Sequence, residues 1–229
     1  MVEEYLQSKK RGGVSSSHHR DLKYRLGKFV DAFVGRQVAS ISPHEVESWL
    51  YGLCLGAQST RNFHARLAAL FNFGVRRNYL GRNPLEAVTR IKVPSRPPGI
   101  YSVEALCQLL AAAPPDLLPS LTVQAFAGLR SSELLRLNWE EVRPRYIEVT
   151  AAASKTATRR LVRIEDNLAA WLDGYRRLNG KVYAKGVQSY QEAVLSLHRR
   201  VGLERVPNGL RHSFGFTTWR GIKTQPGLR

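Results

Sequence analysis

Apolar residues recur every three or four positions in the first part of the chain, which is the pattern of amphipathic helices. One such stripe predicts a helix over residues 21–34, and its members are Leu22, Leu26, Phe29, Val30 and Phe33. Ser42, Pro43 and Glu45 then offer an N-cap, a proline at the first helical position and an acidic first turn. The amino-terminal part of the chain is therefore expected to be helical.

A further helix is predicted over residues 60–78, with Ser59 as its cap. Opposite its apolar stripe lies a set of basic residues: Arg61, His64, Arg66, Arg76 and Arg77. A basic helix face is typical of nucleic-acid contact, and it is about as typical of an ordinary solvated surface. This helix by itself does not decide between the two.

The pattern changes after a Pro-rich, basic segment at residues 92–99. Ser102 is predicted to cap the next helix, whose first turn holds Glu104. Residues 146–150 and 160–164 alternate like two strands, and helical patterns return after Asp166.

These elements predict a mainly α protein with a small antiparallel β-sheet. We expect a helical domain over residues 1–91, a linker over 92–101 and a second domain over 102–229.

The charge of the chain is strongly one-sided, with 35 Lys and Arg against 18 Asp and Glu and a formal net charge of +17. Such an excess is typical of nucleic-acid binding, and double-stranded DNA is the expected partner. A generically basic protein is the plainer alternative.

The composition indicates neither metal nor cofactor. Cys54 and Cys107 lie far apart, without zinc-ligand or disulfide spacing, and no cofactor motif is found. The acidic pairs at 140–141 and 165–166 lack further ligands and are expected at the surface. No apolar stretch is long enough to span a membrane, and we expect a cytoplasmic protein.

The most specific motif is the segment GLRSSELLRLNWEEV at residues 128–142. It resembles the first arginine box of the tyrosine recombinase, or phage integrase, family at nearly every fixed position. The segment SKT at 154–156, followed by the strand at 160–164, looks like the family's lysine-bearing β-hairpin. The segment LRHSF at 210–214 is similar to its second arginine box.

The resemblance implies a catalytic role for Arg130, Lys155 and Arg211. Two guanidiniums would stabilise the charge that develops on a phosphodiester during in-line attack, and the lysine would protonate the leaving oxygen. Glu133, one helical turn after Arg130, could orient the guanidinium. The plain alternatives are a surface ion pair for Arg130 and Glu133, a solvated loop lysine, and one more basic residue on a basic protein.

The chain departs from the family pattern at two places. Asn208 stands where the family has a histidine that acts as general acid and base, and asparagine does not titrate. No tyrosine follows Arg211, so the nucleophilic tyrosine of the family is absent from this sequence, and neither Tyr183 nor Tyr190 stands in its place in the motif order. Residues 217–229 are expected to break the helix found there in the family, and a frameshift near Phe216 is our hypothesis for this ending.

The resemblance also implies the architecture: a helical, SAM-like core-binding domain followed by a catalytic domain that lacks its tyrosine segment. The complete form would cut and rejoin DNA of a mobile element or prophage through a 3′-phosphotyrosine link, and such proteins act as tetramers. For this chain we expect DNA binding, catalytic incompleteness and possible homo-oligomers. The alternative is a non-catalytic regulator or competitor at a recombination site.

Overall fold

The computed structural model describes residues 1–89, 91–95, 97–150 and 159–219, with side chains up to residue 214. The chain divides into two compact units, Met1–Arg96 and Pro97–Arg229. The division falls within the segment 92–101, which the sequence predicts as a linker. Each unit has its own hydrophobic core.

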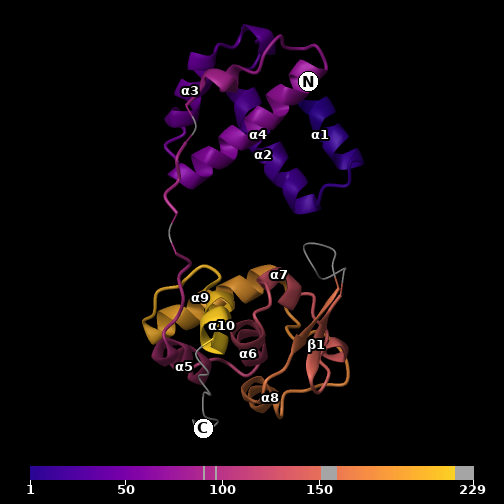
Figure 1. Cartoon of the computed structure of the whole chain (residues 1–229), viewed down its shortest axis with the longest axis vertical. Helices are drawn as coiled ribbons and strands as arrows, with labels where there is room; N and C mark the ends of the chain where they lie inside the picture. Colours follow the sequence, from indigo (N-terminus) through magenta and orange to yellow (C-terminus); the bar gives the residue numbers. More distant parts are fainter. Residues whose placement is uncertain (90, 96, 151–158, 220–229) are drawn as a thin grey trace. The chain divides into compact units, whose positions relative to one another are not determined.

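The first unit is built from helices (Figure 1). They are α1 (Val2–Arg11), α2 (Ser16–Ala32), α3 (Pro43–Gly52) and α4 (Ala57–Arg76), with the short 3-10 helices η1 (Val38–Ser40) and η2 (Pro84–Ala87). Helix α4 supplies the centre of the core, because Leu67, Leu70 and Phe71 are fully buried. Helices α1 and α2 both pack against it.

Local sequence signals set most helix ends in this unit. Ser42 and Glu45 form a reciprocal capping box at the start of α3, as the sequence predicts. Two predictions are wrong in detail. Helix α4 begins after Gly56, so Ser59 lies inside the helix and is not its cap. Helix α2 begins at Ser16, where Ser15 caps it, and Val30 of its predicted stripe is 41% exposed.

The second unit combines helices with a two-stranded sheet (Figure 1). Its elements are α5 (Val103–Ala111), α6 (Leu118–Ala127), α7 (Ser131–Leu134), η3 (Trp139–Glu141), β1 (Tyr146–Val149), β2 (Arg160–Arg163), α8 (Asp166–Leu172), α9 (Val187–Val201) and α10 (Gly209–Trp219). The strands are antiparallel, with Ile147 opposite Val162. The predicted class, mainly α with a small antiparallel sheet, is therefore confirmed.

Helix α6 is the centre of the second unit, and every one of its ten residues is buried. Helices α8 and α10 pack against it. A helix that is buried on every side has no separate apolar and polar faces, so periodicity gives no signal for it. This helix matters for function because it leads directly into the first arginine motif.

Helix α10 carries the second arginine motif and continues through Trp219. The expectation that the helix breaks at residue 217 is therefore wrong for residues 217–219, while the rest of that segment lies outside the described residues. Nowhere in the described chain is a helix both long and apolar enough to cross a membrane.

Candidate phosphate-binding site

Gly128 brings the two arginine motifs together at the end of α6. Its backbone is left-handed, with φ at 62°, which glycine adopts without a steric cost. A Cβ atom on Gly128 would stand 2.4 Å from a ring carbon of Phe214 on α10. The Gly128 carbonyl also accepts a hydrogen bond of 2.9 Å from Nη1 of Arg211. The contact of α6 with α10 therefore needs glycine at this position.

We expect Gly128→Ala to lower the free energy of unfolding by about 2–4 kcal/mol, because a strained backbone and a clash with Phe214 add together. Gly202→Ala is the matched control. Gly202 also ends a helix with a left-handed backbone, but a Cβ there meets nothing within 4 Å. Urea unfolding measures the free energy of unfolding of both variants, and the difference between them is the contribution of the clash with Phe214. An equal loss of stability in the two variants would contradict the close packing of Phe214 against Gly128.

Glu133 is the centre of the site and is fully buried. Its Oε2 accepts a hydrogen bond of 2.9 Å from the backbone amide of Arg130, and its Oε1 accepts one of 2.9 Å from the Arg130 guanidinium. Nη1 of Arg211 lies 3.9 Å from Oε2. A carboxylate with no solvent exposure is not one half of a surface ion pair, so that alternative for Arg130 and Glu133 is excluded.

Arg160 on β2 is a fourth member of the site, which the sequence interpretation missed. Its Nη1 donates to Oε1 of Glu133 at 3.0 Å and its Nη2 donates to Oε2 at 2.8 Å. The resemblance to the family points to the lysine of the hairpin, and the strand at 160–164 is recognised only from its apolar alternation. Arg160 shares the less exposed face of the strand with Val162, and this alternation is the signal that was available.

The electrostatics of the site follow from this geometry. Burial raises the pKa of Glu133, but hydrogen bonds from Arg160 and from the backbone and side chain of Arg130 outweigh it and hold the pKa at about 2. The pKa of Arg211 is lowered by burial and by the neighbouring positive charge of Arg130. Glu133 is thus ionised at neutral pH, beside three guanidiniums.

One carboxylate leaves the charge of these three guanidiniums incompletely balanced. Arg130 and Arg211 each use Nη1 for the contacts above, and their Nε and Nη2 atoms donate no hydrogen bond to another described residue. Both side chains are also partly exposed. Paired, rigidly held guanidinium forks with an excess of positive charge suit the oxygens of a phosphate group.

A hydrogen-bonded junction fixes the start of α10. The hydroxyl of Tyr101 accepts from the Val206 amide at 2.9 Å and lies 2.8 Å from Nε2 of the buried His198. A Cβ on Gly209 would come within 2.5 Å of the Tyr101 ring, so the helix starts against it. This packing sets the position from which Arg211 projects.

Asn208 is exposed and immediately precedes α10. Its backbone is left-handed, with φ at 56°, and asparagine tolerates this conformation better than most residues. The backbone conformation at position 208 therefore favours asparagine, independently of any contact between its side chain and a phosphate.

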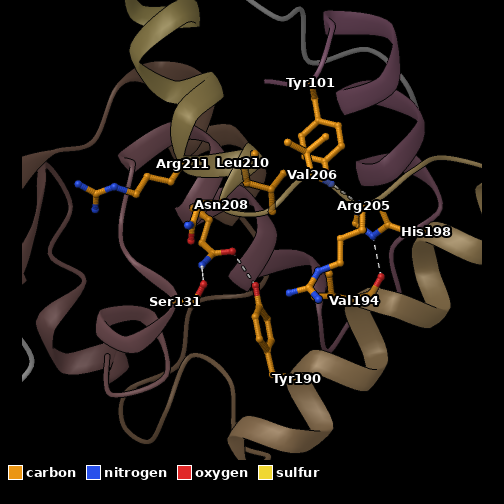
Figure 2. Close-up of a pocket in the computed structure, with 12 residues that line it drawn as sticks. Tyr101, Ser131, Tyr190, Val194, His198, Arg205, Val206, Asn208, Leu210 and Arg211 are labelled. Carbon is orange, nitrogen blue, oxygen red and sulfur yellow. Dashed lines mark hydrogen bonds between the residues drawn. The ribbon is translucent and has the colours of Figure 1, made fainter. Parts of the chain in front are cut away.

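A small cavity of about 50 Å³ adjoins Asn208 and Arg211. Gln124 from α6 spans one side, accepting from the Tyr190 hydroxyl at 2.7 Å and donating to Oγ of Ser131 at 2.9 Å. Figure 2 shows that these hydrogen bonds of Tyr190 and Ser131 meet on one side chain close to Asn208, while the Arg211 side chain extends away from Tyr190 and His198. These two hydrogen bonds connect α9, through Gln124, to Ser131 beside Arg130.

We expect Tyr190→Phe to destabilise the second unit by about 1–3 kcal/mol, because the buried Gln124 amide loses a partner. Tyr146→Phe is the control, since Tyr146 is 37% exposed. Thermal unfolding measures both, and equal stability of the two variants would argue against the Gln124 contact.

Lys155 lies outside the described residues. Tyr183 and Tyr190 are core residues, 2% and 5% exposed. In the described ranges, no group of three or more His, Cys, Asp or Glu side chains is arranged to hold a metal ion.

Two curated sequences similar to this chain are an integrase and a protein named as a putative defective protein. ICEBs1 integrase of Bacillus subtilis (strain 168) is 24% identical over 165 residues, which are 69% of this chain and 41% of that protein. The second, "Putative defective protein IntQ" of Escherichia coli (strain K12), is 31% identical over 87 residues, which are 38% of this chain and 22% of that protein. The chain thus spans less than half of either relative. No family model matches it.

Solved structures give the fold. The lambda integrase (75-356) dimer bound to a COC′ core site superposes with a TM-score of 0.83 at 14% identity, over 96% of this chain and 89% of that one. The integrase of transposon Tn1549, in complex with a circular intermediate DNA, gives a TM-score of 0.65 at 14% identity, over 98% and 88%. The resemblance inferred from the motifs is confirmed: this chain has the fold of the tyrosine recombinases.

Proposed function

We propose that this chain is a DNA-binding protein of the tyrosine recombinase and integrase class, and that Arg130 and Arg211 hold a phosphate of the DNA backbone. The observation that carries the proposal is the convergence of these arginines, from the N-cap of α7 and from α10, on the buried Glu133. The net charge of +17 supports a polyanionic partner. The similar structures titled as complexes with DNA support the choice of DNA.

We propose further that Lys155 and Asn208 face the same phosphate, as the motif order implies. Lys155 would donate a proton to the leaving oxygen of the sugar, and Asn208 would offer a hydrogen bond without titrating. The linker at 92–101 would let each unit contact DNA. No metal or cofactor is needed for this chemistry.

In this proposal the 229 residues bind DNA without forming a covalent link to it. All nine tyrosines precede Arg211, and the two nearest in sequence, Tyr183 and Tyr190, have their rings in the core. A buried phenol cannot reach a phosphate without unfolding its surroundings. The burial of these two rings also favours the second candidate, a non-catalytic regulator or competitor at a recombination site.

Fluorescence anisotropy with a labelled duplex at several salt concentrations tests DNA binding. We expect strong binding at low salt, and a log–log slope of roughly −0.9 for each phosphate neutralised on duplex DNA. Binding with no dependence on salt would contradict the proposal.

A duplex nicked near the candidate cleavage point tests the covalent step. We expect retardation of the duplex without a protein–DNA adduct that survives denaturing gel electrophoresis. A trapped adduct would show that a tyrosine of this chain does act as the nucleophile.

A further inference from the structure

We propose that Arg160 is a positioning residue of the phosphate site, acting on the phosphate through Glu133 and Arg130. The inference rests on the proposed function, since it assigns how the arginines of that same site are oriented. The observation that supports it is the bidentate contact between Arg160 and Glu133, which joins strand β2 to the first arginine motif.

Each carboxylate oxygen of Glu133 accepts two hydrogen bonds. Oε1 accepts from Nη1 of Arg130 and Nη1 of Arg160, and Oε2 accepts from the Arg130 backbone amide and Nη2 of Arg160. Each oxygen is thus held by one donor from each arginine. A fork-to-fork contact fixes the plane of the carboxylate, and the carboxylate in turn fixes the direction of the Arg130 guanidinium.

Arg160 itself is turned toward the protein. Both of its terminal nitrogens contact Glu133, whereas Arg130 contributes only one guanidinium nitrogen to the same carboxylate. The two arginines therefore have different roles. Arg160 satisfies the buried carboxylate, and Arg130 keeps donors for an anion.

The charges lead to the same conclusion. The carboxylate alone would neutralise one of the two phosphate-facing arginines. Arg160 offsets that negative charge, and its hydrogen bonds to Glu133, together with the charge of that carboxylate, raise the pKa of Arg160. The positive charge of Arg130 and Arg211 is therefore retained for the phosphate.

Strand β2 supplies a matched control for this role. Arg163 lies three residues further along the same strand, but its side chain is 82% exposed and pairs with the exposed Glu165. Replacing Arg163 removes the same charge from the same strand without touching Glu133.

The test is arginine side-chain NMR of the full chain, with inorganic phosphate as the probe at low ionic strength. In wild type we expect the Nε resonances of Arg130 and Arg211 to shift as phosphate is added. We expect Arg160→Gln to move the Arg130 resonance before phosphate is present and to weaken phosphate binding about tenfold. Arg163→Gln is expected to bind within about twofold of wild type and to leave the Arg130 resonance in place.

A more conservative variant, Arg160→Lys, tests the same role if Arg160→Gln does not fold. Arg160→Lys retains the charge but loses the two-pronged contact. We expect it to lose less affinity than the glutamine variant while still moving the Arg130 resonance. Wild-type affinity and an unmoved Arg130 resonance in the folded Arg160 variants would overturn the positioning role alone. No response of wild type to phosphate would overturn the proposed phosphate site as well.

Discussion

Replacing Glu133 by alanine is expected to lower the free energy of unfolding of the second unit by about 3–5 kcal/mol. Glu133 is 1% exposed, and three guanidiniums would face one another without their shared counter-charge. The Arg130 amide would also lose its acceptor at the start of α7. Chemical denaturation followed by circular dichroism measures the loss.

Glu45 is the matched control for Glu133. It also accepts from the backbone amide at the start of its helix, through a contact of 2.9 Å from Ser42, and it also pairs with an arginine, Arg36. Its side chain is 37% exposed, so water can replace its partners. We expect a much smaller loss for Glu45→Ala, and equal losses would contradict the argument from burial.

The same carboxylate makes stability depend on pH. Its pKa is held at about 2 in the folded chain, below the ordinary value of 4.5. Its stabilising contribution is therefore fully present above about pH 4.5 and is lost as the pH falls toward 2, amounting to about 3 kcal/mol. Because other carboxylates titrate nearby in pH, the measurement is the difference between wild type and Glu133→Gln. That difference is expected to shrink over this window, and a constant difference would refute the assignment.

Removing both of the arginines that we propose to hold a phosphate, Arg130 and Arg211, is expected to have the largest effect on DNA binding. We expect Arg130→Ala and Arg211→Ala each to weaken binding by about tenfold to hundredfold, because each loses charged hydrogen bonds to a phosphate. The log–log slope against salt should become shallower by about 1 for each variant. Anisotropy titrations at several salt concentrations measure both quantities.

Two further variants test the guanidinium geometry and the position of the charge. Arg211→Lys keeps the charge, so we expect the salt slope to stay near wild type while affinity falls from loss of the planar fork. Arg177→Ala removes an exposed arginine in the segment after α8, away from Glu133 in sequence, and is expected to change neither quantity measurably. If the double variant of Arg130 and Arg211 binds as wild type does, the DNA does not contact this site.

Much of the local structure was readable from the sequence because its signals are local. The capping box of Ser42 and Glu45, the cap at Ser102 and the two alternating strands all appear in the structure. Apolar periodicity located the core face of α4 for the same reason. It failed for α6, whose residues are buried on every side and therefore show no period.

The sequence by itself determined the class of fold and two arginines of the candidate site, because a dense motif and the composition carry that information. Only the tertiary structure decided that Glu133 is buried, that Arg160 from a strand 27 positions away shares its oxygens, and that Gly128 abuts Phe214. These contacts join residues distant in the chain, and no local pattern records them. The charge balance that would hold a phosphate therefore depends on the packing of α6, α7, α10 and β2 around one carboxylate.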